Sequence, residues 1–395
     1  MLNEQQKKII AATLPVVAEN LPTIVGKFYQ NLFINHPELK NLFNQTNQKT
    51  GFQQQALTSS IAAFVINYEE NLLRIQPMLK QIAFKHVSLG VTGDMYQIVA
   101  DNLMAAIAEV LKDAVTEEVA DAWGSMYWEL ANTLIDMEKD IYGQNKVLPN
   151  NFLSKCSLIN RVTESSNTFS LYFKANSEML QNYVPGQYVS IKVNLEENKH
   201  QFRQYSISDL PNQDIFRVTI KREDELFGVE TVSNNLFKNA LQNTEWELSY
   251  PAGNFSIVNP QKTIVLLSVG IGVTPIFAML KQLLSIPCNS SIFFIHLTED
   301  SNSHTFKAEL AELNDERLTK CVVYRNPLSS DLKDVDYNIA GNFNFNAYSQ
   351  FILEDAGYYL CASPQFIKAT KLELTKLGVS LSNIYAESFE PDAYN

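Results

Sequence analysis

The sequence predicts a multidomain protein with three folds in succession: an all-α domain, a small antiparallel β-barrel, and an α/β domain with a parallel sheet. The first observation is length, because 395 residues exceed the roughly 250–300 at which a single hydrophobic core stops growing. The second is that the apolar periodicity changes twice, which gives domains of residues 1–147, 148–260 and 261–395. Hydrophobic residues make up 46% of the chain, enough apolar surface for three cores.

The first domain has helical periodicity almost throughout. Segments such as LTSSIAAFVINYEENLL and MYQIVADNLMAAIAEVL repeat apolar residues at the spacing of one helix face. Proline and glycine predict the breaks between helices, at Pro22, Pro37, Gly51, Pro77 and Gly90–Gly93. Because no alternating strand pattern occurs here, we expect an all-α domain of about six to eight helices.

The second domain changes to short β-branched and aromatic runs: TFSLYF, QYVSIKV, QYSIS, FRVTIKRE and EWELSY. The turn sequences PGQ and PAGN lie between them. This pattern is typical of short antiparallel strands that close into a small barrel. One helix, around Thr231–Leu241, interrupts the strands.

The third domain alternates strands and helices. TIVLLSV, SIFFIHL, KCVVYR and GYYLC are apolar runs of the kind found in buried strands. The helical segments PIFAMLKQLL, TFKAELAEL and PQFIKATKLELTKLG separate them. Strand–helix alternation predicts a parallel, doubly wound sheet.

Charge and cysteine usage exclude several classes of protein. The net charge of −12 would repel a phosphate backbone, so nucleic acid is excluded as a partner. The four cysteines are scattered with no CxxC pair, which argues against a disulfide framework and against zinc or iron–sulfur sites; they are Cys156, Cys288, Cys321 and Cys361. A reducing compartment fits this usage, and we expect a cytoplasmic monomer.

One uncharged stretch, Thr263–Leu280, is long enough to resemble a transmembrane helix. Its centre, however, contains two glycines and a proline, which favours a buried strand, a glycine turn and the start of a helix. The N-terminal MLNEQQKKII carries charges from the outset and lacks the apolar core of a signal peptide. The sequence therefore predicts no transmembrane segment.

His86 is the candidate ligand of the helical domain. The segment PMLKQIAFKHVSLG places Met78, Leu79, Ile82 and Leu89 on the same helix face as His86. Burying an imidazole without a partner costs about 1–3 kcal/mol, so a group must satisfy it. Taken alone, a backbone carbonyl is the simpler partner.

Several separated segments favour a metal ion over a backbone carbonyl as the partner of His86. FYQNLF, HPELKNLFNQTNQ, QQQAL, KQIAFKH, DAWGSMYWELA and EKDIY occur in this order. Together they resemble the globin domain of the flavohaemoglobins, and the resemblance continues to the end of the chain. It implies haem b, with His86 as the proximal ligand and metal ligand. It also implies that Glu138, with Tyr96 beside it, accepts the Nδ1–H of the imidazole, which strengthens the histidine as a ligand.

The same resemblance implies a pocket on the distal side of the haem. Phe43 would stack on the porphyrin, and Tyr29, Gln53 and Leu57 would line the pocket. Taken singly, Phe43 and Leu57 could be ordinary core residues. A phenol or an amide donor would stabilise the negative charge that dioxygen acquires at ferrous iron. We expect Tyr29 to be the main donor and Gln53 the second, and a lipid is a further candidate ligand of this pocket.

An Arg-Gln-Tyr-Ser motif ends one strand of the predicted barrel, at Arg203, Gln204, Tyr205 and Ser206. An arginine fork suits a pyrophosphate, a tyrosine ring suits the face of a flavin, and a serine hydroxyl can reach flavin N5. The motif is weak alone. The PGQY sequence ending at Tyr188 lies upstream of it.

Further motifs follow in order. Lys221 begins a Lys-Arg-Glu run, and Val232 and Ser233 begin a Val-Ser-Asn run before the PAGNF sequence. The ordered set resembles the FAD-binding barrel of the ferredoxin–NADP reductase superfamily and implies FAD at these residues. The preceding segment DELFGVET is longer and poorer in glycine than is usual, so we expect that loop to differ.

A glycine turn follows a strand and opens a helix; its residues include Gly270, Gly272, Val273, Thr274 and Pro275. Glycines there let backbone N–H groups approach a phosphate at the positive end of the helix. A tight strand–helix turn without a ligand is the simpler alternative. The family uses a GxGxTP turn of this kind for NADH or NADPH, and Glu299, at the end of the next strand, slightly favours NADH.

Two departures from the family pattern concern the nicotinamide site. The family usually has Gly-Pro after the last-strand cysteine, whereas this chain has Ala362 and Ser363 after Cys361. Near the C-terminus, Glu390 stands where the family commonly has glycine. Glu387 matches the acid near the hydride path, and Phe389 matches the aromatic residue that covers the flavin.

The resemblance implies a nitric oxide dioxygenase that oxidises NO with O2 to nitrate, using electrons from NAD(P)H through FAD to haem. Hydride carries two electrons and haem accepts one, so a flavin is the required adaptor. Two other functions stay open: an NAD(P)H-dependent haem oxidase or hydroperoxide reductase, and an O2- or lipid-binding globin with a module that keeps its iron reduced.

Overall fold

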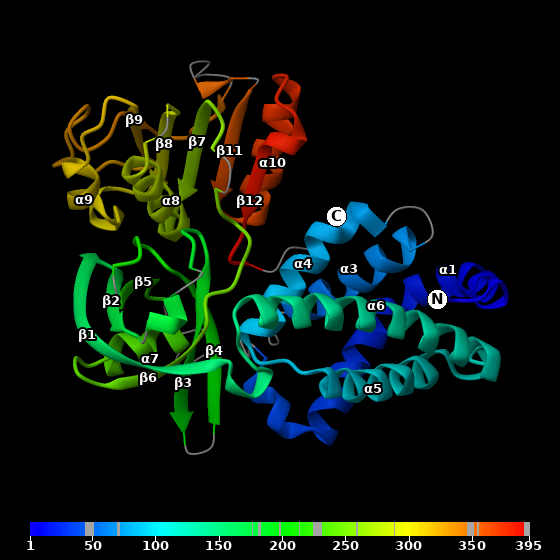
Figure 1. Cartoon of the computed structure of the whole chain (residues 1–395). Helices are drawn as coiled ribbons and strands as arrows, with labels where there is room; N and C mark the ends of the chain where they lie inside the picture. The colour runs from blue at the N-terminus through cyan, green and yellow to red at the C-terminus, as the bar shows by residue number, and fades with distance from the viewer. Residues whose placement is uncertain are drawn as a thin grey trace. The chain divides into compact units, whose positions relative to one another are not determined.

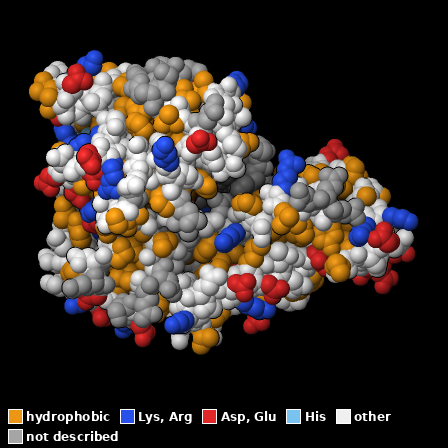
Figure 2. Space-filling model, turned by 45° about the horizontal axis from the view of Figure 1, so that its top comes forward, with side chains coloured by type: hydrophobic (Ala, Val, Ile, Leu, Met, Phe, Trp, Pro, Cys, Tyr) orange, Lys and Arg blue, Asp and Glu red, His pale blue; other side chains and the backbone are white. Residues whose placement is uncertain are grey.

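The computed structural model describes residues 1–43, 51–68, 72–175, 177–180, 183–196, 199–212, 214–223, 231–257, 260–287, 289–345, 351–353 and 355–390. The chain forms two compact units. The first contains Met1–Leu153 and Lys192–Arg203, and the second contains Ser154–Ile191 and Gln204–Glu390. The acidic and basic side chains on the face drawn in Figure 2 are scattered among apolar ones.

The first unit is helical, as the apolar periodicity predicts. Its described residues form five α-helices and two 3-10 helices before residue 147: α1 (Glu4–Asn35), η1 (Pro37–Asn41), α3 (Phe52–Asn67), α4 (Leu72–Ser88), α5 (Gly93–Leu111), η2 (Lys112–Ala114) and α6 (Glu117–Gln144). Asn3 begins α1 with a capping box that includes Gln6. In the described residues, α1 is long and apolar enough to cross a membrane by length and composition; it packs here against α3, α5 and α6.

Two of the expected helix breaks are wrong. α1 continues through Pro22 and α4 continues through Pro77. An internal proline removes one backbone hydrogen bond and costs about 3 kcal/mol. Near Pro22, Leu21, Ile24 and Val25 are all buried, and each such side chain contributes about 1.5–3 kcal/mol. Packing of the apolar face therefore outweighs the proline, whereas the breaks at Pro37, Gly51 and Gly90–Gly93 are confirmed.

The FAD-type barrel pattern appears as an antiparallel sheet in the order β4-β3-β6-β1-β2-β5. Its strands are β1 (Leu153–Ser165), β2 (Thr168–Lys174), β3 (Tyr188–Glu196), β4 (Lys199–Ser206), β5 (Ile215–Lys221) and β6 (Glu245–Ser249). A bridge between Ile207, just after β4, and Val218 on β5 joins the two ends of this order. The helix α7 (Val232–Asn239) lies where the sequence predicts one. β1 was not among the predicted strands, because its sequence mixes Ser, Lys and Asn with few β-branched residues.

The third domain has a parallel sheet in the order β10-β9-β8-β7-β11-β12. Its strands are β7 (Thr263–Val269), β8 (Ser291–Thr298), β9 (Leu318–Tyr324), β10 (Ile339–Ala340), β11 (Ala356–Cys361) and β12 (Ile384–Glu387). The helices α8 (Val273–Ser285) and α9 (Lys307–Glu312) share one core with the sheet. The helix α10 (Pro364–Lys376) packs into a second core on the other face (Figure 1). The doubly wound fold is confirmed, and Thr263–Leu280 consists of β7, a glycine turn and α8.

Candidate functional site

The proximal group of the helical unit is a contact among three helices. His86 lies near the end of α4, Tyr96 on α5 and Glu138 on α6. The Nδ1 atom of His86 lies 2.8 Å from Glu138 Oε1 and 3.0 Å from the Tyr96 hydroxyl. The Tyr96 hydroxyl donates to the same carboxylate oxygen at 2.5 Å. The structure therefore brings together the three residues that the sequence predicts for the proximal side.

The chemistry of this group suits a histidine ligand of iron. A carboxylate accepts, so the Nδ1–H of His86 donates to Glu138 and the other ring nitrogen, Nε2, carries the lone pair. Burial, with the Glu138 carboxylate beside it, raises the pKa of Tyr96, so the phenol keeps its proton and donates. The Tyr127 hydroxyl donates to the backbone oxygen of Tyr96 at 2.7 Å and helps to hold that segment of α5.

The distal residues come from α1 and α3. Tyr29 is buried, and its ring contacts the edge of the Phe43 ring at 5.7 Å between centroids. Gln53 and Leu57 lie one turn apart on α3, and Leu57 packs with Phe43 against the same core. The Oε1 atom of Gln53 is buried and has no hydrogen-bond partner in the described part of the chain. A buried amide oxygen of this kind needs a hydrogen-bond donor, and the amide nitrogen of the same side chain is the group that could donate to a ligand.

The FAD motif lies on β4 beside β3. Arg203, Gln204 and Tyr205 are half-buried, and Ser206 is buried. The Gln204 amide donates to Ser190 on β3 at 3.3 Å. Tyr188 begins β3.

A second part of the predicted FAD site gathers at the start of α7. Thr231 caps the helix by accepting a hydrogen bond from the backbone of Asn234. Val232 and Ser233 form its first turn, and the Ser233 hydroxyl accepts from the backbone of Glu223 at 3.2 Å. Lys221 ends β5 two residues before that contact. The structure therefore brings Glu223, the last residue of the Lys-Arg-Glu run, to the Val-Ser pair. The segment of residues 224–230, with the predicted unusual loop, lies outside the described residues.

The glycine turn ends β7 and opens α8. Gly270 has φ of +54°, a conformation that glycine adopts at little cost. A Cβ atom on Gly272 would lie 2.2 Å from the backbone oxygen of Cys361, so the turn requires glycine there. Val273, Thr274 and Pro275 form the first turn of α8, in which the Val273 N–H bonds to the carbonyl oxygens of Gly270 and Ile271 and Pro275 has no N–H. The positive end of the helix beside the glycine turn fits a dinucleotide phosphate.

The carboxyl ends of β7, β11 and β12 meet beside that turn. Cys361 pairs in register with Ser268 on one side and with Glu387 on the other. Burial raises the pKa of Glu387 to about 8, and its Oε2 atom has no hydrogen-bond partner within the described ranges. Burial, and then the charge of Glu387, raises the pKa of the Cys361 thiol. Ligands of parallel sheets bind at this edge, so Gly272, Cys361 and Glu387 fit the predicted nicotinamide site.

The structure gives Ser363 a local role. Its hydroxyl caps α10 by accepting from the backbone of Phe366 at 3.4 Å, and Ala362 beside it is buried. The side chain of Phe389 is 50% exposed, and Glu390 is also exposed. Glu299 follows β8 and accepts a hydrogen bond from the Asn326 amide, so its carboxylate already has one partner.

Three family models match successive parts of the chain. The globin model matches residues 26–134, the oxidoreductase FAD-binding domain residues 155–257 and the oxidoreductase NAD-binding domain residues 266–372. Flavohemoproteins of Bacillus subtilis and Rhizobium meliloti are 36% and 35% identical. The first match covers 99% of this chain and 98% of the relative, and the second covers 100% of both.

The chain belongs to the flavohemoprotein family. A crystal structure of a flavohemoglobin from Malassezia yamatoensis, with bound FAD and heme, has a TM-score of 0.85 at 27% identity. It matches 98% of this chain and 99% of its own. The FAD/NAD-binding domain of a nitric oxide dioxygenase from Vibrio cholerae, at 27% identity and a TM-score of 0.52, covers 60% of this chain and 98% of its own. The protein is therefore a flavohemoprotein oxidoreductase whose cofactors are haem, FAD and a nicotinamide dinucleotide, as predicted.

Sequence reasoning missed one buried charged group of this flavohemoprotein. Arg217 lies in the middle of β5 and is 1% exposed. The available signal was a lone arginine between apolar residues in the run FRVTIK, which predicts a buried charge with partners. Of its acidic partners, Asp209 and Glu309 belong to no motif, and Glu309 lies 92 residues away.

Proposed function

We propose that this flavohemoprotein is a nitric oxide dioxygenase, which converts NO and O2 to nitrate with electrons from NAD(P)H. The observation that carries the proposal is the distal pair, because Tyr29, which is buried, and Gln53 belong to adjoining helices of one core. The Tyr29 hydroxyl and the Gln53 amide nitrogen are the groups that can donate, and the Gln53 Oε1 atom is buried without a partner among the described residues. Hydrogen-bond donors aimed at a developing negative charge stabilise it strongly in a site without water.

The cofactors divide the chemistry by electron count. When bound, FAD accepts a hydride and releases single electrons, and haem iron binds diatomic gases. His86 would hold the iron through Nε2, and Glu138 and Tyr96 would orient the imidazole from the Nδ1 side. Tyr29 and Gln53 would hold dioxygen by hydrogen bonds and keep it in place until NO arrives.

The reductase residues would supply electrons. Arg203 and the start of α7 would bind the FAD phosphates, and Tyr205 would lie against the flavin. The Gly270–Gly272 turn would bind the nicotinamide dinucleotide, with Glu387 near the hydride path. The relative named as a nitric oxide dioxygenase in Vibrio cholerae supports this assignment for the reductase part. We further propose NADH as the donor, and a cytoplasmic monomer.

A second function is binding of an apolar ligand such as a lipid. One cavity of the helical unit is lined by apolar and aromatic side chains of α1, α3, α5 and α6, among them Leu21, Ile61, Leu103 and Trp123. Apolar cavities stay dry and accept apolar guests, but this one has a volume of only about 30 Å³ and none of the predicted distal residues lines it, so only its apolar lining supports this function. Organic extraction of the purified protein followed by mass spectrometry tests this function, and an extract without lipid would argue against it.

The decisive experiment measures NO consumption and nitrate formation per nicotinamide oxidised, with and without oxygen. Dioxygenase activity requires oxygen and yields two nitrate ions for each nicotinamide, because each NO needs one electron. An NAD(P)H oxidase would consume nicotinamide and oxygen as fast without NO as with it. A hydroperoxide reductase would oxidise nicotinamide with an alkyl hydroperoxide in the absence of oxygen. Comparing kcat/KM for NADH and NADPH tests the choice of donor.

A further inference from the structure

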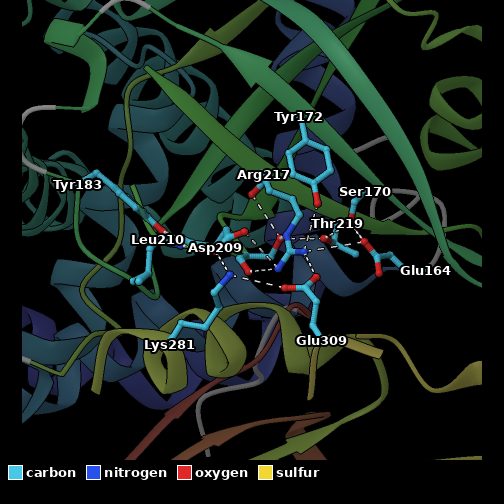
Figure 3. Close-up of polar contacts among 11 residues, drawn as sticks. Glu164, Ser170, Tyr172, Tyr183, Asp209, Leu210, Arg217, Thr219, Lys281 and Glu309 are labelled. Carbon is cyan, nitrogen blue, oxygen red and sulfur yellow. Dashed lines mark hydrogen bonds and ion pairs between the residues drawn. The ribbon is translucent and has the colours of Figure 1, made fainter. Parts of the chain in front are cut away.

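Between the barrel and the NAD-binding domain, a group of charged side chains surrounds the buried Arg217 and belongs to neither cofactor motif. Figure 3 shows the Arg217 guanidinium at its centre, with Asp209 on the barrel side, Glu309 of α9 beside the guanidinium and Lys281 of α8 beside Asp209. Arg217 forms an ion pair with Glu309, and Lys281 forms one with Asp209. Lys281 Nζ also lies 3.5 Å from the Glu309 carboxylate. We call these four residues the charge clamp.

Arg217 has partners for each of its nitrogens. Nε donates to the Ser208 hydroxyl at 3.1 Å, and Nη2 donates to the Ser208 backbone oxygen at 2.8 Å. Nη1 donates to Glu309 and, at 3.4 Å, to the Tyr172 hydroxyl. Burial opposes the charge, but the carboxylates of Asp209 and Glu309 outweigh it and raise the pKa of Arg217. The guanidinium therefore stays charged, with its plane held in one orientation.

An aromatic residue holds Arg217 from the NAD-binding side. The Phe306 ring lies 4.3 Å from the guanidinium carbon and stacks on Phe277 of α8 at 4.8 Å. Phe306 has φ of +63°, which is strained for a bulky residue. Phe277 and Lys281 are four residues apart and lie on the same face of α8. α8 thus supports Phe306 through Phe277 and contributes Lys281 to the ion pair with Asp209 of the barrel.

The clamp joins the segments that carry the two cofactor motifs. Asp209 lies three residues after Ser206, the last residue of the Arg-Gln-Tyr-Ser motif on β4. Lys281 lies on α8, the helix that the glycine turn opens. The ion pair between Asp209 and Lys281 therefore connects the strand predicted to hold the flavin with the helix predicted to hold the dinucleotide phosphate.

We propose that the charge clamp sets the orientation between the barrel and the NAD-binding domain that hydride transfer requires, with Arg217 and Lys281 as positioning residues. Ion pairs with fixed donor directions hold two domains in one relative position, whereas an apolar contact of the same size lets the domains slide past each other. Hydride passes between the two rings only over a short distance, so a shift of about 1 Å can slow the step roughly a hundredfold. The inference rests on the reductase assignment and is independent of what the haem does with NO.

Lys281→Met tests the clamp, because Lys281 lies at its edge with 24% of the side chain exposed. The matched control is Lys320→Met. Among the described residues, Lys320 Nζ donates to the backbone oxygens of Leu310 and Leu313, at 3.1 and 3.0 Å, and both lie inside the NAD-binding domain. Both variants lose one lysine from the same domain, so net charge and its effect on an anionic dinucleotide change equally.

The measurement is anaerobic rapid mixing of the full haem- and FAD-loaded chain with NADH, without NO. In Lys281→Met we expect the limiting rate of flavin reduction per bound FAD to fall about tenfold or more. The NADH dissociation constant should change less than about threefold, and Lys320→Met should match the parent. A limiting rate in Lys281→Met within about twofold of the parent would overturn the proposal.

A spectroscopic readout separates position from stability. Stacked nicotinamide and flavin rings give a long-wavelength charge-transfer absorbance, so Lys281→Met should weaken that band at saturating NADH while FAD content stays at the parent level. A band of unchanged amplitude would contradict the proposal. Glu309→Gln, which keeps the size of the side chain, should weaken the band in the same direction. These readouts need no NO, so a failed dioxygenase assignment would leave them unaffected.

A double-variant comparison tests whether the residues act as one contact. Asp209→Asn and Lys281→Met should each slow hydride transfer. The double variant should be slowed by clearly less than the product of the two single effects, since both remove the ion pair between Asp209 and Lys281, while each also loses a second contact, to Arg217 or to Glu309. If the two effects multiply, the residues act independently and there is no clamp.

Discussion

At His86, a carboxylate and a phenol meet on the same ring nitrogen. The carboxylate oxygen of Glu138 accepts from both His86 and Tyr96, so the imidazole cannot rotate without breaking two contacts. Outer contacts of this kind orient a metal-binding histidine and increase its basicity. The residue types and their chain positions were predictable by family resemblance, whereas the contacts among the three helices come from the structure.

Tyr29→Phe tests the distal pocket. A hydrogen bond to a charged group contributes about 1.5–3 kcal/mol, and about 1.4 kcal/mol corresponds to tenfold in an equilibrium constant. Loss of the hydroxyl should therefore speed dissociation of dioxygen about ten- to a hundredfold. Carbon monoxide, which carries little negative charge when bound, should dissociate at nearly the parent rate. Flash photolysis and stopped-flow mixing measure both rates.

The double variant Tyr29→Phe with Gln53→Leu is the stronger comparison, because Gln53 can donate in place of Tyr29. Flavin reduction by NADH serves as its control and should stay at the parent rate, since that step needs neither residue. Dioxygen dissociation at the parent rate in the double variant would show that neither side chain faces the ligand.

Glu387 predicts a pH dependence of stability. Burial raises the pKa of this carboxyl to about 8, well above its usual value, so the folded protein binds a proton that the unfolded chain has released. Stability from this group is therefore fully present below about pH 4.5 and declines as the pH rises toward 8, by at most about 1.4 kcal/mol per pH unit. Glu387→Gln stays neutral and should lack this decline.

Thermal unfolding of the parent and of Glu387→Gln between pH 5 and pH 9 measures the effect. The difference in melting temperature between the two proteins should move in favour of the variant as the pH rises. A difference that is constant across this range would mean that Glu387 titrates normally.

At the scale of elements, the turn between β7 and α8 depends on the absence of a side chain. Gly272→Ala would place a Cβ atom against the Cys361 backbone oxygen, so β11 or the turn must move. Overpacking of this kind costs about 1–3 kcal/mol. We expect a lower melting temperature and weaker binding of NADH, measured by calorimetric titration.

Gly143→Ala is the matched control, because nothing lies within 4 Å of a Cβ atom at this position of α6. A helix gains about 0.5–1 kcal/mol from this change, so the control should be as stable as the parent or slightly more stable. Parent-like NADH binding in Gly272→Ala would show that the turn does not hold the dinucleotide.

At the scale of the whole molecule, the helical core and the reductase cores belong to separate compact units. His86→Ala should therefore lose haem while it keeps FAD and NADH-dependent flavin reduction. The Soret absorbance, the extracted flavin and the rate of flavin bleaching on mixing with NADH measure these three properties. Retention of haem with an axial nitrogen ligand would overturn the assignment of His86.

Arg203→Ala gives the reciprocal result. Losing a bidentate contact to a pyrophosphate should strip FAD and stop reduction of the haem by NADH. The chemically reduced haem should still bind carbon monoxide with the parent spectrum. Normal FAD content in this variant would contradict the proposed role of Arg203 in the barrel.

Much of this architecture was predictable from the sequence by itself. Helical periodicity, alternating strands and strand–helix alternation are local properties of a segment, so they identify the three folds without tertiary information. Local signals fail where packing outweighs them. Pro22 and Pro77 lie inside helices because the apolar faces around them are buried, and β1 forms from a polar sequence because its neighbours supply the pairing.

The sequence by itself determined the fold class, the family and the cofactor motifs, because each depends on residue types at short, ordered spacings. Only the tertiary structure placed Gly272 against Cys361 and Cys361 beside Glu387, and joined Arg217 to Glu309 across 92 residues. It also buried the Gln53 oxygen, which has no partner among the residues that the structure describes. Contacts between distant segments have no period in the sequence. They arise when buried charges and polar atoms must find partners during packing, so their geometry belongs to the folded chain.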